Sequence, residues 1–166
     1  MSVHAVVLAA GASSRYGTSP PKQAAFLPLV LTALRRSTTI DAFVVVLGAH
    51  DVPTDAPAVS CADWDQGPGA SLRCGLAALP PEAEAAVVVL GDGPNLDPRT
   101  IDRVVEDWRA NGGDVVAASY DGVRLHPVLL ARAAWSGVPD DGARSLDARL
   151  VDCSDLEPPG DVDVRE

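Results

Sequence analysis

The feature that most constrains the fold of this 166-residue chain is the alternation of short apolar runs with helix-like segments. Residues 3–10, 43–47 and 85–90 are almost wholly apolar and are rich in valine or alanine. Runs of this length and composition are typical of strands that are buried on both faces of a parallel sheet. Because helix-like segments alternate with these runs, the pattern predicts a doubly wound α/β fold.

The expected helices lie at residues 28–36, 70–79 and 98–110. The last of them starts with proline and is followed by glycines, which is the usual distribution of these residues around a helix. Residues 114–120 are expected to form a further strand. Asp121-Gly122 then predicts a tight turn into an antiparallel strand at residues 123–125. The sheet is therefore expected to be mixed.

These elements predict a single domain over residues 1–166, folded as a three-layer α/β/α sandwich. Its Rossmann-like sheet is expected to be mostly parallel, with one antiparallel strand. A short helix is expected at residues 143–150. Residues 157–166, which are acidic and rich in proline and glycine, are expected to form a frayed tail.

The charge of the chain excludes several classes of partner. Its 13 basic and 23 acidic side chains give a net charge of −10, which disfavours attraction to nucleic acid or to anionic lipid. No apolar run approaches the ~20 residues that cross a bilayer. We therefore expect neither a nucleic acid nor a membrane as a partner, and a phosphate-bearing ligand would need local donors or a metal ion.

The cysteines suggest a reducing compartment. Cys61, Cys74 and Cys153 are odd in number and show no C-x-x-C spacing, and no leader-like segment opens the sequence. We expect three free thiols and a cytoplasmic chain, with each cysteine a small buried side chain rather than a nucleophile.

The first apolar run leads into a glycine- and serine-rich segment at residues 11–17. Ligands of open α/β sheets bind beyond the carboxyl ends of the strands, so this segment is well placed to meet a triphosphate. Arg15 and Lys22 could offset the phosphate charge. Lys22 is the only lysine of the chain, which favours a compact point charge at this position, although chance explains one lysine equally well. A plain glycine-rich turn is the alternative for the segment as a whole.

The order L-A-A-G-x-S-x-R-x-G, followed by Pro21-Lys22-Gln23, resembles the signature of the MobA-like nucleotidyltransferases. It is most similar to their molybdopterin cytidylyltransferase branch. The resemblance implies a nucleotide-diphospho-sugar transferase-like fold, a loop that wraps the triphosphate, and catalytic roles for Arg15 and Lys22. It implies nucleotide contacts from Leu8, Ala9, Ala10, Gly11, Ser13, Ser14, Arg15 and Lys22.

A second glycine-rich segment leads into the helix expected at residues 70–79. Free N–H groups at Gly69 and Ser71 could meet a base edge or an anion. The segment is similar to the family's G-M-S-x-S-L-R-x-G-L, which implies nucleotide contacts from Gly69, Ser71 and Arg73. A capped helix that packs its leucines on the core is the alternative.

Asp92 follows the apolar run at residues 85–90 and is well placed to hold Mg²⁺, which prefers carboxylate and phosphate oxygens. An isolated Asp-Gly-Pro sequence would otherwise be a simple turn. The family carries G-D-Q-P or G-D-M-P here, so the resemblance implies that Asp92 is a catalytic metal ligand for Mg²⁺ or Mn²⁺. Gly93 replaces the family's larger side chain. Asp163 matches the second metal ligand of the family.

Two further stretches resemble family motifs, R-G-H-P-V-L and G-D-x-G-A-R. They imply that His126 and Arg144 line the acceptor side of the site. A histidine before proline is more often structural, which is the alternative for His126. Some stretches are shorter than in the family, so the chain is identified as a shortened member.

The resemblance implies transfer of a nucleoside monophosphate, CMP in the branch it most resembles, from a nucleoside triphosphate to a phosphorylated small molecule such as molybdopterin cofactor, with release of pyrophosphate. An acceptor apoenzyme and a monomeric or weakly dimeric state are expected. Two alternatives stay open. One is a nucleotide-binding regulator or inactive paralogue, and the other is a nucleotidyltransferase for a sugar phosphate or phospholactate.

Overall fold

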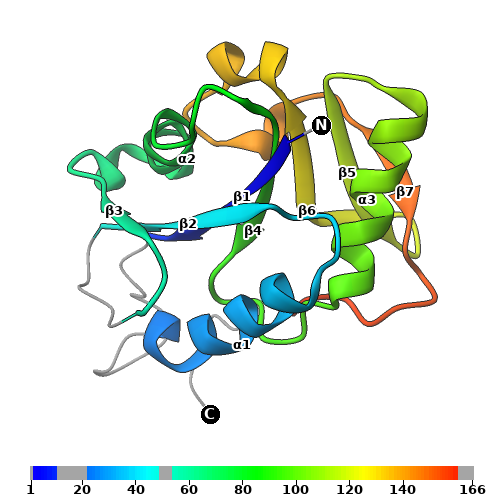
Figure 1. The fold of residues 1–166 in the computed structure, drawn as a ribbon, viewed down its shortest axis with the longest axis horizontal. Helices are drawn as coiled ribbons and strands as arrows, with labels where there is room; N and C mark the ends of the chain where they lie inside the picture. The colour runs from blue at the N-terminus through cyan, green and yellow to red at the C-terminus, as the bar shows by residue number, and fades with distance from the viewer. Residues whose placement is uncertain (1, 11–21, 49–53, 161–166) are drawn as a thin grey trace.

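The computed structural model describes residues 2–10, 22–48 and 54–160 (Figure 1). Its strands are β1 (Ser2–Ala9), β2 (Ala42–Leu47), β3 (Ala58–Ser60), β4 (Ala83–Leu90), β5 (Val115–Tyr120), β6 (Val123–Ala131) and β7 (Arg149–Asp152). Its helices are α1 (Lys22–Arg36), α2 (Pro68–Ala77) and α3 (Pro98–Asn111), with 3₁₀ turns η1 (Trp64–Gln66), η2 (Arg132–Gly137) and η3 (Ala143–Ser145). The seven strands form one sheet in the order β3-β2-β1-β4-β6-β5-β7.

Only β6 runs against its neighbours in this sheet, because it pairs antiparallel with both β4 and β5. The other pairs, β1 with β2 and β4, β2 with β3, and β5 with β7, are parallel. The predicted fold class, a mostly parallel sheet with one antiparallel strand, is confirmed.

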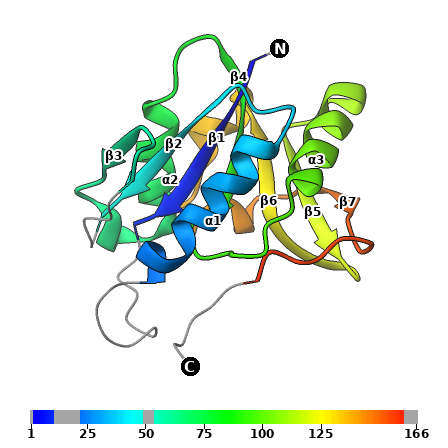
Figure 2. The ribbon, with the colours of Figure 1, turned by 60° about the horizontal axis from the view of Figure 1, so that its bottom comes forward.

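The sheet lies between two helical layers (Figure 2). Side chains alternate along β1, so Val7 joins the core under α1 and α3 while Val6 joins the core under α2. Leu27 and Ile101 are buried in the first core and Leu72 in the second. No helix in the described part of the chain is both long and apolar enough to cross a membrane.

Helix α1 is longer than the sequence pattern indicates. A helix was expected from Pro28, but α1 begins at Lys22 and contains Pro28 in its interior. An interior proline costs about 3 kcal/mol because its ring removes a backbone hydrogen bond and crowds the preceding turn. Burial of Leu27, Val30 and Leu34 against the sheet offsets this cost, since each such side chain contributes roughly 1.5–3 kcal/mol.

The hairpin between β5 and β6 is confirmed. Asp121 and Gly122 have φ values of 52° and 81°, the left-handed backbone that a two-residue hairpin turn requires. Strand β6 continues to Ala131, well beyond the expected three residues, and its His126–Pro127 peptide is cis. His126 therefore lies inside a strand of the sheet rather than in a loop after it.

The helix expected at residues 143–150 is wrong. The chain makes only the 3₁₀ turn η3 there, and then β7 pairs with the edge strand β5. Packing against the rest of the protein explains the difference. Val151 and Cys153, two residues apart, are both buried in the core under α1 and α3, as side chains on one face of a strand are. Residues 157–160 do not fray, since the Asn95 N–H donates to the Pro159 carbonyl at 2.8 Å. The rest of the expected tail lies outside the described residues.

The expectation of three free thiols is also wrong. Cys61 follows β3, Cys74 lies on α2, and a disulfide joins them across a Cα–Cα distance of 6.0 Å, within the usual range for such a bond. Their wide spacing in sequence hid this contact, which the packing of α2 beside β3 creates. Cys153 is a buried free thiol. The cysteine argument for a cytoplasmic chain therefore no longer holds.

Candidate active site

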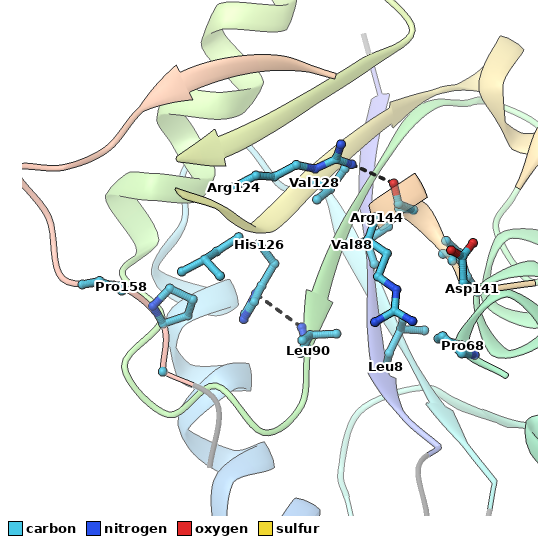
Figure 3. A pocket seen from close by; sticks show the side chains of 16 residues that line it. Leu8, Pro68, Val88, Leu90, Arg124, His126, Val128, Asp141, Arg144 and Pro158 are labelled. Carbon is cyan, nitrogen blue, oxygen red and sulfur yellow. Dashed lines mark hydrogen bonds between the residues drawn. The ribbon is translucent and has the colours of Figure 1, made fainter. Parts of the chain in front are cut away.

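A cavity of about 630 Å³ opens at the carboxyl ends of β1 and β4, on the α2 side of the sheet (Figure 3). The chain passes from β1 outward to β3 in one direction and continues beyond β4 in the other, so the cavity lies where the strand order reverses. Ligands of open α/β sheets bind at such points. Its lining residues are mostly apolar, and they come from β1, α2, β4, β6, the segment 141–144 and the segment 158–160.

One wall of the cavity is the loop before η3, which is fixed to the start of α2. The Gly69 N–H donates to the Asp140 carbonyl at 2.8 Å. The Arg73 guanidinium donates to the Val138 carbonyl at 2.8 Å and to the Asp140 carboxylate at 3.0 Å. A Cβ at Gly69 would lie 1.9 Å from the Pro139 carbonyl oxygen, so only glycine permits this approach. The Gly69 N–H, which was expected to be open to a ligand, is therefore occupied.

Arg124 on β6 fixes the next part of the same wall. Its guanidinium donates to the carbonyl oxygens of Ala143, at 2.7 Å, and Leu146, at 2.5 Å. These bonds hold η3 beside β6 and so place Arg144 at the cavity. Arg144 makes no hydrogen bond or ion pair with other described residues, and its side chain extends across the cavity in the direction of Leu8 (Figure 3).

His126 points into the cavity from β6 and is 9% exposed. Its Nδ1 accepts the Leu90 N–H at 3.5 Å, while its Nε2 has no hydrogen-bond partner among the described residues. Burial lowers the pKa of His126 from 6.5 to about 4, and the negative charge of Asp92 only partly opposes this shift. The imidazole is therefore neutral at neutral pH. A Cβ at Gly93 would lie 3.0 Å from both Cε1 and Nε2 of the ring.

Asp92 is half-buried immediately beyond β4. The preceding residue, Gly91, donates its N–H to the Leu8 carbonyl at 2.9 Å, which joins the end of β4 to the end of β1. Asp92 thereby lies close to the point where the chain leaves β1 for the glycine-rich segment. In the described ranges, no three His, Cys, Asp or Glu side chains gather closely enough to hold a metal ion.

The model of the MobA-like NTP transferase domain matches residues 5–152 of the sequence. The chain belongs to this family. It is by family a nucleotidyltransferase, and apart from the first three residues of β1 the strands and helices that border the cavity lie within the matched region.

Solved structures and a curated relative resemble this nucleotidyltransferase. Rv0371c from Mycobacterium tuberculosis H37Rv is 26% identical, with a TM-score of 0.79 over 98% of this chain and 93% of that chain. A structure of Rv0371c in complex with manganese is 24% identical over 92% of this chain and 88% of that chain, with a TM-score of 0.69. The bifunctional protein GlmU from Micrococcus luteus is 43% identical over 68 residues, which span 40% of this chain and 14% of GlmU.

The structure brings part of the predicted site of this nucleotidyltransferase together. Leu8, His126 and Arg144 line one cavity, and Ala9 and Ala10 follow Leu8 at the buried end of β1. Lys22 is the first residue of α1, and Ser71 is buried on α2. The predicted residues that lie outside the described ranges are Gly11, Ser13, Ser14, Arg15 and Asp163.

Several cavity residues of the nucleotidyltransferase were not predicted from the sequence. Arg124 and Asp141 stand within the motif stretches that carry His126 and Arg144, so those motifs were the signal for them. Residues 158–160 gave no such signal, because their composition resembles that of a frayed end.

Proposed function

We propose that this nucleotidyltransferase transfers CMP from CTP to a phosphorylated acceptor and releases pyrophosphate. The observation that carries the proposal is the position of the cavity. It opens where β1 leads into the glycine-rich segment 11–17, and the same cavity contains His126 and Arg144. A nucleotide held by the segment after β1 and an acceptor held by β6 and η3 would meet at this edge of the sheet.

The reaction requires little covalent chemistry from the protein. An oxygen of the acceptor phosphate attacks the α-phosphorus of CTP and forms a new P–O bond. The bond between the α-phosphorus and the oxygen that bridges to the β-phosphorus breaks, and pyrophosphate leaves with the electron pair. Because the acceptor phosphate is already ionised at neutral pH, no general base is needed. Catalysis depends on in-line positioning and on offsetting negative charge.

The nucleotide half of the site is proposed to begin at Leu8 and to continue through the glycine-rich segment. Ala9 and Ala10 are small and buried, and they allow the backbone to approach phosphate closely. Arg15 and Lys22 are proposed to offset the triphosphate charge. The remaining proposed contacts come from Gly11, Ser13 and Ser14 in the loop and from Ser71 and Arg73 on α2. Gly69 is proposed to contribute only its shape to the α2 wall, because its N–H donates to the Asp140 carbonyl.

A divalent ion is proposed to bind at Asp92. A half-buried carboxylate beyond a strand end suits Mg²⁺ or Mn²⁺, because these hard ions combine one or two carboxylates with phosphate oxygens and water. When bound, such an ion offsets charge on the triphosphate. Asp163 is proposed as the second protein ligand. Manganese is included because Rv0371c has been solved in complex with it.

The acceptor is proposed to be molybdopterin cofactor, the substrate of the branch that the sequence motifs resemble most, with delivery to an apoenzyme afterwards. A cavity of about 630 Å³ is large enough for such a molecule, since small-molecule sites usually measure about 300–1,000 Å³. Its apolar walls, from Leu72, Val88 and Val128 among others, suit a ring system that carries few charges of its own.

A pyrophosphate-release screen tests the proposal. The four ribonucleoside triphosphates are paired with molybdopterin, sugar phosphates and phospholactate, in Mg²⁺ and in Mn²⁺. We expect release only when CTP and a phosphorylated acceptor are both present, and loss of release in Asp92→Asn. Asp114→Asn is the matched control, because Asp114 is exposed before β5 at the opposite edge of the sheet. Binding of CTP and metal without release from any pair would identify a nucleotide-binding protein instead.

A further inference from the structure

The disulfide between Cys61 and Cys74 ties helix α2 to the edge of the sheet. Cys61 is 2% exposed, and its N–H donates to the Leu47 carbonyl at 2.7 Å, so the end of β2 holds it in place. Cys74 lies in α2, the helix whose first residues border the cavity. The bond therefore closes a segment, residues 61–74, that contains η1 and the start of the α2 wall.

This closed segment supports the nucleotide half of the proposed site. Trp64 in η1 packs beside Gly48, because a Cβ at position 48 would lie 2.5 Å from the Trp64 Cβ and 2.8 Å from the Ala10 carbonyl oxygen. The turn η1 thus lies against the chain where it leaves β1 and β2. Farther along the segment, Pro68 and Leu72 line the cavity itself.

The segment also fixes the loop before η3. The Gly69 N–H donates to the Asp140 carbonyl at 2.8 Å, and a Cβ at Gly67 would lie 2.7 Å from the same carbonyl oxygen. This loop continues into residues 141–144, which form the next part of the cavity wall. A displacement of residues 67–69 would therefore move two walls of the cavity.

The two cysteines differ in their access to solvent. Cys61 is buried, whereas Cys74 is half-buried and follows the exposed Arg73 on α2. Thiol–disulfide exchange starts when a thiolate attacks one of the two sulfurs, and access decides which one. A thiolate from solution would therefore attack at Cys74, with Cys61 as the leaving group.

The structure also accommodates the reduced form. The Cys61 Sγ lies 3.6 Å from the Ala70 carbonyl oxygen, so after reduction its S–H has an acceptor and does not become an unsatisfied buried group. Leu72 and Leu76 bury α2 against the core whether or not the bond is present. None of residues 62–68 is buried, so this part of the segment has little packing of its own. Loss of the bond should therefore loosen residues 62–69 and leave α2 on the sheet.

We propose that the Cys61–Cys74 bond is a site of reversible thiol–disulfide exchange that controls nucleotide binding, with a dithiol as the reductant. A thiolate of the dithiol attacks the Cys74 sulfur, the S–S bond breaks, and Cys61 leaves as a thiolate that takes up a proton. The second thiol of the reductant then attacks the mixed disulfide, and Cys74 is released as a thiol. Two electrons and two protons pass to the protein, the reductant becomes a disulfide, and a disulfide oxidant reverses the exchange. The choice of CTP as the nucleotide rests on the proposed function.

The first test measures CTP binding in the two redox forms, with Mg²⁺ and without acceptor. In the disulfide form the walls are already ordered, whereas the reduced form must order residues 62–69 when CTP binds. Fixing the backbone of a single residue corresponds to about a tenfold loss of affinity. We therefore expect dithiothreitol to raise the CTP dissociation constant at least about tenfold, and glutathione disulfide to restore it.

Two cysteine variants isolate the bond. Cys74→Ser cannot form it and keeps the Cys61 thiol beside Ala70, so it should bind CTP like the reduced wild type and not respond to dithiothreitol. Cys153→Ser is the matched control, because Cys153 is a buried free thiol in the core under α1 and α3, and this variant should respond as the wild type does. Equal CTP affinity in the two forms of the wild type, with alkylation proving that the bond was reduced, would overturn the proposal.

Hydrogen exchange of the two forms, read by mass spectrometry, needs no nucleotide. We expect reduction to speed exchange in residues 62–70 and 138–142, while β1 and β4 stay protected. Unchanged exchange in these two segments, or loss of protection in β1 and β4 as well, would contradict local control of the cavity walls. If neither form binds CTP, the proposed function fails, and the exchange comparison still decides whether the bond controls the α2 wall.

Discussion

Acidification should destabilise this protein through His126 before its carboxylates respond. The pKa of this histidine is lowered from 6.5 to about 4, chiefly by burial and despite the charge of Asp92. Between these two values the unfolded chain binds a proton that the folded chain does not. The stability that depends on the neutral ring is therefore fully present above about pH 6.5 and is lost as the pH falls toward about 4.

The magnitude follows from the two pKa values. Each tenfold difference in proton affinity corresponds to 1.36 kcal/mol, so the whole effect is about 3 kcal/mol, of which about 2 kcal/mol is lost by about pH 5. Domains of this size are stable by only about 5–15 kcal/mol. Carboxylates act at lower pH, as Asp97 shows, because the hydrogen bond from Arg99 holds the pKa of Asp97 below its usual 3.8.

Urea unfolding at about pH 7.5 and about pH 5 measures this loss. We expect the free energy of unfolding to fall by about 2 kcal/mol in the wild type and to change far less in His126→Asn. The variant His4→Asn is the control, because it removes another histidine and should keep the wild-type loss. Parallel pH profiles in the wild type and His126→Asn would show that His126 is not a buried neutral histidine.

Three further predictions concern the disulfide and the cations of the site. Reduction of the Cys61–Cys74 disulfide, whose cysteines are 13 residues apart, should lower the free energy of unfolding measured in urea by about 3 kcal/mol. A variant with both cysteines replaced by serine should not respond to reductant, and three titratable thiols in the unreduced, denatured protein would contradict the bond. Bound CTP with Mg²⁺ should protect Lys22 from amine-directed labelling. Lys22→Ala should weaken CTP binding about ten- to hundredfold, and Lys22→Arg should recover only part of that loss. Equal labelling with and without nucleotide would show that Lys22 does not contact the phosphates. Arg144→Ala should raise the acceptor KM with little change in CTP affinity, and equal loss of both would place Arg144 in the nucleotide half.

The sequence predicts the central part of the fold because burial on both faces leaves a clear pattern. Strands β1, β2 and β4 are largely apolar, and the Asp121-Gly122 turn has the residues that a positive φ requires. Strands β3 and β7 are only three and four residues long and lie at the sheet edges, so they carry too few apolar residues to be recognised. Their existence depends on pairing with neighbours, which local sequence does not encode.

The candidate site was predictable where a family motif contains the residue, and not where a contact between distant segments determines what the residue does. His126 and Arg144 come from separate motifs, and the structure places both in one cavity. The occupied N–H of Gly69 depends on the fold of the loop before η3. Gly93 is visible in the sequence as a departure from the family pattern, but its meaning requires the position of the His126 ring.

The most direct test of the central claim follows both ends of the triphosphate in one reaction. CTP labelled at the α-phosphate or at the γ-phosphate is incubated with the protein, Mg²⁺ and the acceptor. We predict that the α label appears in the acceptor product and the γ label in pyrophosphate, one for one, and that Asp92→Asn does neither. Release of the γ label as inorganic phosphate, or its transfer to the acceptor, would contradict nucleotidyl transfer at this site.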